Sequence, residues 1–117
     1  MTASDIAGSI NRVLEHLKPN GQGRQALEYA NLLLTNLMVL LRPIRIKKQE
    51  PGSPKVRYTA ERIGLPLEKV RLLRTSVFRG VKEIERGDHL AARETFTAAR
   101  DTWQADGEKP TPQAQGG

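Results

Sequence analysis

The segment that most constrains the fold is residues 24–42, which is apolar around most of a helix. Its polar residues repeat every three or four positions and form one thin stripe, consisting of Arg24, Glu28, Asn31 and Thr35. A helix with so little polar surface lies at the centre of a domain or in a subunit interface. The most apolar run, Tyr29 to Leu41, is shorter than the about 20 residues that span a bilayer. We therefore expect a buried helix and no membrane partner.

Three more segments have apolar residues at spacings of three and four, which is the helical period. In residues 4–18 these are Ile6, Ile10, Val13, Leu14 and Leu17, with Ser4 as the predicted N-cap. In residues 66–86 they are Val70, Leu73, Val77, Val81 and Ile84. In residues 89–104 they are Ala92, Phe96, Ala99 and Trp103. Gly87 and Asp88 stand where one helix would end and the next would be capped.

The region between the second and third helices, residues 43–59, predicts a basic β-hairpin. Two arms alternate apolar and polar residues on either side of a loop that contains Pro51 and Gly52. The predicted apolar face is Ile44, Ile46, Val56 and Tyr58, and the opposite face is Arg45, Lys47, Arg57 and Thr59. A flexible basic loop, or a short helix beginning at Pro54, would also fit this stretch.

Together these segments predict a mainly α protein. A chain of 117 residues supplies one domain. We expect a small four-helix domain over residues 1–104, built from two helical hairpins with the basic hairpin or loop between helices 2 and 3. The remaining residues, 105–117, contain two prolines and end in two glycines, and they predict a disordered tail.

Positive charge is concentrated in one third of the chain. The formal net charge is +6, but residues 42–82 hold twelve basic and three acidic side chains. A polyanion is the partner that such a cluster favours, because each neutralised phosphate releases bound counterions. We therefore predict nucleic-acid binding, to DNA or RNA, through phosphate contacts from Arg45, Lys47, Arg57, Lys69, Arg71, Arg79 and Lys82. The alternatives are a solvated basic face, or docking to an acidic protein or membrane surface.

Residues 59–73 resemble the helix-turn-helix family. Ala60 stands four residues before Gly64, and Val70 follows six residues after it. The resemblance implies that the helix from Pro66 would lie in the major groove of DNA. Its early outward positions would be Leu67, Glu68, Arg71 and Leu72, and leucine and glutamate are poor donors to base edges. A corner that packs two helices and reads no bases explains the same residues.

A stretch of roughly 34 residues resembles one tetratricopeptide repeat. The matching small and aromatic positions are Gly80, Gly87, Ala92, Phe96 and Ala99. Arrays of that repeat usually need three copies, so an ordinary antiparallel hairpin is the simpler explanation. The competing functional class is a helical protein-interaction module, in which apolar residues outside the core contact a partner. Leu72 and Phe78 are the predicted interface residues, and a homodimer would cover the apolar excess of the second helix.

Chemistry-bearing residues are scarce. The chain has no cysteine, and its two histidines, His16 and His89, fall on different predicted helices. Neither a phosphate-binding glycine loop nor a catalytic or metal-ligand spacing is present. We therefore predict no enzyme activity, no cofactor and no metal. The N-terminal residues lack the pattern of a secretory signal, which predicts a cytoplasmic location.

Overall fold

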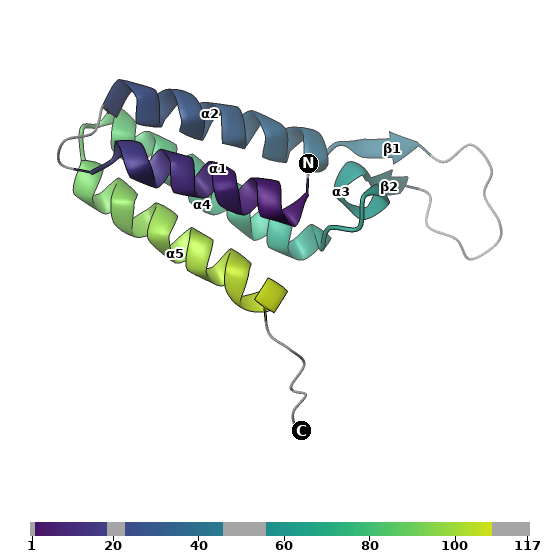
Figure 1. The fold of residues 1–117 in the computed structure, drawn as a ribbon. Coiled ribbons are helices and arrows are strands. Elements are labelled where there is room, and N and C mark those ends of the chain that lie inside the picture. Colours follow the sequence, from purple (N-terminus) through teal and green to yellow (C-terminus); the bar gives the residue numbers. More distant parts are fainter. Residues whose placement is uncertain (1, 19–22, 46–55, 109–117) are drawn as a thin grey trace.

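The computed structural model describes residues 2–18, 23–45 and 56–108 and shows a four-helix bundle with a small hairpin at one end (Figure 1). The long helices are α1 (Ala3–His16), α2 (Gly23–Leu40), α4 (Leu67–Glu85) and α5 (His89–Glu108). Successive long helices run in opposite directions (Figure 1). Both α1 and α4 pack against α2 and α5, which closes the bundle. The prediction of a mainly helical domain made of two helical hairpins is confirmed.

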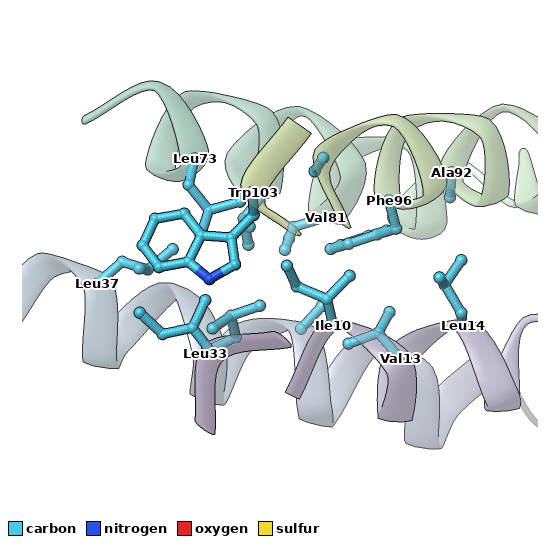
Figure 2. Close-up of a cluster of buried hydrophobic side chains, with 14 of the residues drawn as sticks. Ile10, Val13, Leu14, Leu33, Leu37, Leu73, Val81, Ala92, Phe96 and Trp103 are labelled. Atoms are coloured by element: carbon cyan, nitrogen blue, oxygen red, sulfur yellow. The ribbon is translucent and has the colours of Figure 1, made fainter. Parts of the chain in front are cut away.

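The three predicted apolar stripes of α1, α4 and α5 form the core. All fourteen of their residues are buried, together with Ala26, Ala30, Leu33, Leu37 and Leu40 of α2. Figure 2 shows Ile10, Leu33, Phe96 and Trp103 pointing toward the middle of the bundle from three different helices. Burying apolar area of this kind is the main stabilising contribution to a small domain. Part of α2 remains uncovered, since Leu32, Met38 and Val39 are exposed.

The start of α1 differs from the prediction. Thr2 is the N-cap of α1: its hydroxyl accepts a hydrogen bond from the Asp5 N–H, and its own N–H donates to the Asp5 carboxylate. The predicted cap, Ser4, instead lies inside the helix, because the reciprocal pairing of Thr2 with Asp5 sets the start two residues earlier. At the other junction the prediction is confirmed. Gly87 has a φ of 81°, and the Asp88 carboxylate accepts a hydrogen bond from the Ala91 N–H.

The described part of the inserted hairpin pairs in a different register from the predicted one. Strands β1 (Pro43–Arg45) and β2 (Val56–Tyr58) pair antiparallel, with Ile44 opposite Arg57. Directly opposite residues of an antiparallel pair share a face, so the prediction that Ile44 and Arg57 lie on separate apolar and basic faces is wrong. The cause is a register one residue away from the predicted one. It is fixed where both the N–H and the hydroxyl of Thr59 donate to the Arg42 carbonyl oxygen.

A further helix, α3 (Thr59–Arg62), follows β2 directly and was not predicted as a separate element. It is one turn long. It begins where the Tyr58 N–H donates to the Glu61 carboxylate, and the Leu65 N–H bonds back to the Ala60 carbonyl oxygen after it. The last helix, α5, continues to Glu108, which is four residues past its predicted end. The rest of the predicted tail, 109–117, lies outside the described residues, as do Ile46 and Lys47.

Candidate nucleic-acid interface

The outer face of α4 carries four cations. Its apolar stripe faces the bundle, and the exposed residues Arg71, Arg74, Arg79 and Lys82 lie away from that stripe. At 1.5 Å per residue, Arg71 and Lys82 are about 16 Å apart along the helix. A row of cations of this length along one rigid element can contact several phosphates of a polyanion at once.

Three of these cations have acidic neighbours on α4, namely Arg71 with Glu68 at 3.6 Å, Arg79 with Glu83 at 3.4 Å and Lys82 with Glu85 at 3.7 Å. Exposed pairs of this type contribute little stability, so a phosphate can replace the carboxylate at low cost. Within the described ranges, Arg74 has no such pair. The Arg74 guanidinium can therefore contact a phosphate without first breaking an ion pair.

Arg79 is more constrained than the other three. Its partner Glu83 is only 5% exposed, and the Glu83 carboxylate also accepts a hydrogen bond of 2.6 Å from the Thr95 hydroxyl of α5. A buried carboxylate needs such partners, because burying an unpaired charge is costly. Arg79 therefore also neutralises the buried Glu83 carboxylate. A ligand phosphate that binds Arg79 has to compete with that carboxylate.

A hollow of about 460 Å³ opens beside α4 at the hairpin end of the bundle. Its apolar lining comes from Met38, Leu41 and Leu72, its polar lining from Arg71, Arg74 and Thr75, and its aromatic side chain is Tyr58. The Arg71 guanidinium carbon lies 5.3 Å from the centre of the Tyr58 ring, within the range of a cation–π contact. The hollow thus combines a flat ring, an apolar floor and two cations.

A second aromatic residue lies farther along the same side of α4. Phe78 is 52% exposed, and the Lys82 ammonium lies 5.3 Å from its ring centre. Seven residues separate Arg71 from Phe78, which is almost two whole helical turns. The pairs Tyr58–Arg71 and Phe78–Lys82 therefore follow one another along α4, each with a cation next to a ring.

Of the three phosphate contacts predicted on the hairpin, the structure describes the exposure of one. Arg57 is exposed on β2. Arg45 lies in β1, but its side chain is not among the described groups, and Lys47 falls in 46–55, outside the described residues. Since Arg57 shares its face with Ile44, the described part of the hairpin does not present a separate basic face.

Lys69 lies apart from the other predicted phosphate contacts. Its ammonium donates a hydrogen bond of 2.9 Å to the Trp103 carbonyl oxygen and lies 4.7 Å from the centre of the indole ring. It borders a separate groove of about 150 Å³ between α4 and α5, which Ser76 and Thr102 also line. Lys69 therefore links α4 to α5 and does not belong to the row formed by Arg71, Arg74, Arg79 and Lys82.

The two predicted interface residues are both exposed. Leu72 is 63% exposed and Phe78 is 52% exposed, although α4 packs against two helices. Leu72 borders both the hollow and the α4–α5 groove. Leu72 and Phe78 thus lie on α4 between the predicted basic contacts Arg71, Arg79 and Lys82.

Residues 59–73, which resemble a helix-turn-helix, form a turn between two helices, but only the second helix is longer than one turn. The turn contains Gly64 with a φ of 83°, a conformation that favours glycine, and α4 follows it. The preceding helix, α3, has a single turn. Of the outward positions at the start of α4, Glu68 and Leu72 are exposed and Leu67 is half-buried. The corner serves to hold Tyr58 beside α4.

Arg74, Met38 and Leu41 are residues of the hollow that sequence reasoning missed. The phosphate contacts predicted on this helix were Lys69, Arg71, Arg79 and Lys82, and they left out Arg74, although it lies only about 60° from Arg71 around the helix. Its place three residues after Arg71 was a usable signal. No such signal existed for Met38, because apolar residues surround most of α2 and only the bundle geometry shows which ones stay uncovered.

The described residues include no cluster of three or more histidine, cysteine or acidic side chains that could hold a metal ion. His16 Nδ1 lies 2.9 Å from the Arg12 carbonyl oxygen, and the His89 ring lies beside Gly23. No helix in the described part of the chain has the length and hydrophobicity needed to cross a membrane. Comparisons of the chain with protein-family models, with curated proteins and with solved structures gave no match.

Proposed function

We propose that this protein is a non-enzymatic, cytoplasmic nucleic-acid-binding protein that contacts phosphates with the outer face of α4. The observation that carries the proposal is the row of exposed cations on α4, two of which, Arg71 and Arg74, border a hollow with an aromatic side chain. Lys82 extends the row, and Arg57 adds an exposed cation on the neighbouring β2. Binding of this type builds affinity from many phosphate contacts and needs no catalytic group.

The test is a fluorescence-anisotropy titration with labelled DNA and RNA at about 50 mM and about 200 mM salt. We expect micromolar or tighter binding that weakens steeply as salt rises. The triple variant Arg71→Gln, Arg74→Gln, Lys82→Gln should weaken binding and reduce the slope of log affinity against log salt by about 2, since each lost phosphate contact removes about 0.7–0.9.

The matched control is the triple variant Lys18→Gln, Arg24→Gln, Arg93→Gln. It removes the same charge from exposed positions outside the hollow and the α4 row. If the two triple variants bind equally well, net charge and not the α4 face drives binding. If the unmodified protein binds no nucleic acid at low salt, the proposal is wrong.

A protein-interaction module is the second candidate, because large apolar side chains interrupt the same surface. Met38 and Leu72 are 55% and 63% exposed, and both line the hollow. A partner held by apolar contacts, including a second copy of this chain, would stay bound at high salt. Phe78→Asp should weaken that complex, whereas loss of the α4 cations should affect it less.

A further inference from the structure

The hollow beside α4 has a composition that a duplex backbone does not require. Phosphates of a double helix need cations and hydrogen-bond donors, and its base faces are stacked inside. Here Met38, Leu41 and Tyr58 line the same space as Arg71 and Arg74. A ligand that fills it must combine negative charge with a flat apolar surface. An unpaired nucleotide has both.

The backbone at Tyr58 is held by hydrogen bonds on both sides along the chain. The Tyr58 N–H donates to the Glu61 carboxylate at 3.0 Å, and the Thr59 N–H donates to the Arg42 carbonyl oxygen at 3.1 Å. Pro43 lies opposite Tyr58 in the hairpin. Because these contacts already fix the backbone, stacking on the ring would cost little additional conformational entropy.

Phe78 provides a second exposed ring on the same side of α4. It lies about 10 Å along the helix from Arg71, which contacts Tyr58. That separation is about three times the 3.4 Å rise between stacked bases of one strand. The two rings therefore suit different bases of one strand, and a base that stacks on either ring has to leave the stack of its own strand.

We propose that the preferred ligand is single-stranded nucleic acid, with one base stacked on Tyr58 in the hollow and another on Phe78. Arg71, Arg74 and Lys82 neutralise the phosphates between and beside these bases. This inference rests on the proposed function and names the substrate class of the same surface. The contact with bases is through ring faces, so it carries no strong sequence preference.

The experiment compares three labelled probes with the same number of phosphates per strand, about 16. They are a thymine-only single strand, a single strand of the same length without bases, and a duplex. We expect the thymine strand to bind at least about tenfold more tightly than the strand without bases, since stacking on each ring contributes on that order. We also expect it to bind more tightly than the duplex.

Variants locate the effect. Phe78→Leu should reduce the preference for the thymine strand by roughly tenfold, and Phe78→Tyr, which keeps a ring, should retain it. Phe78 is exposed, so the fold should be unaffected, and circular dichroism verifies this. At the other ring, Tyr58→Leu should lower the preference and Tyr58→Phe should keep it.

The outcomes separate this inference from the function on which it rests. Equal, salt-sensitive binding of the thymine strand and the strand without bases overturns base stacking and leaves phosphate binding intact. A duplex that binds as tightly as the thymine strand also overturns the single-strand preference. If none of the three probes binds at low salt, both proposals are wrong.

Discussion

Two glycines within the helices of this bundle have different surroundings, because one is buried and the other is exposed. Gly80 is buried in α4 against the ring of Phe96, and a Cβ at Gly80 would clash with the Cε2 and Cζ atoms of that ring. Gly8 lies exposed in α1, and no atom beyond its chain neighbours and its own helix backbone stands within 4 Å of the position its Cβ would occupy. The first glycine allows α4 and α5 to approach closely, and the second has no such role.

We predict opposite effects when each glycine is replaced by alanine. Gly80→Ala should lower the free energy of unfolding by about 1–3 kcal/mol, because overpacking outweighs the better helix propensity of alanine. Gly8→Ala should raise it by about 0.5–1 kcal/mol, because only propensity changes. Urea unfolding followed by the fluorescence of Trp103, the single tryptophan, measures both. A Gly80→Ala protein as stable as the unmodified one would show that Phe96 moves aside freely.

Among the elements, α1 illustrates how a helix start responds to pH. The Asp5 carboxylate accepts a hydrogen bond of 2.9 Å from the Thr2 N–H. This bond, followed by the Thr2 hydroxyl, holds the pKa of Asp5 below its ordinary value of 3.8. A carboxyl whose pKa is lower in the folded state stabilises the fold above its unfolded pKa. That contribution is lost as the pH falls through the folded pKa.

We therefore expect Asp5→Ala to destabilise the protein near neutral pH, and the difference from the unmodified protein to shrink as the pH falls below about 3.8. Thermal unfolding followed by circular dichroism across this range provides the measurement. Ser4→Ala is the control, because Ser4 lies within α1, its side chain is exposed to solvent, and it has no capping role. A pH-independent effect of Asp5→Ala would contradict the role assigned to the ionised carboxylate.

The elements that could be predicted from the sequence are those with a strong local period. Apolar residues three and four apart, such as Val70, Leu73 and Val77, specify a buried helix face without reference to any neighbour. The hairpin register could not be predicted in this way, because alternation along the strands favours a register that matches their apolar faces, and the observed register lies one residue away from it. The hydrogen bonds from Thr59 to Arg42, distant in the sequence, decide between them.

The candidate site was predictable only in part for the same reason. Charge density pointed to residues 42–82 and periodicity put Arg71 and Lys82 outside the core. The hollow depends on α2 and Tyr58 meeting α4, and no local pattern encodes that contact. Lys69 illustrates the limit, since its nearest aromatic ring belongs to Trp103, which is 34 residues away.

For the molecule as a whole, the first and last helices are joined directly. The Trp103 Nε1–H donates a hydrogen bond of 3.0 Å to the Ala3 carbonyl oxygen, and the Arg100 guanidinium donates one of 3.2 Å to the Asn11 side chain. Trp103 is also buried in the core, as Figure 2 shows. These contacts close the bundle between α1 and α5, so we expect the four long helices to unfold together.

We predict that Trp103→Ala costs about 3–5 kcal/mol, which is a large part of the stability of a typical small domain. Amide hydrogen exchange should then accelerate in α1 as well as in α5. The control is Leu90→Ala, on α5, because Leu90 is 70% exposed and its loss leaves no buried cavity. Faster exchange confined to α5 would mean that α1 and α2 remain folded without it.

The closure between α1 and α5 also bears on how the chain emerges from the ribosome. The α1–α2 pair can form early, but Ile10 and Leu33 face a space that Phe96 and Trp103 fill only after α5 has been synthesised (Figure 2). At about 5–20 residues per second, the roughly 70 residues from Leu33 to Trp103 take about 4–14 s to add, and the nascent chain carries that open apolar face meanwhile. Slower translation lengthens this interval, during which a chaperone can bind the uncovered face.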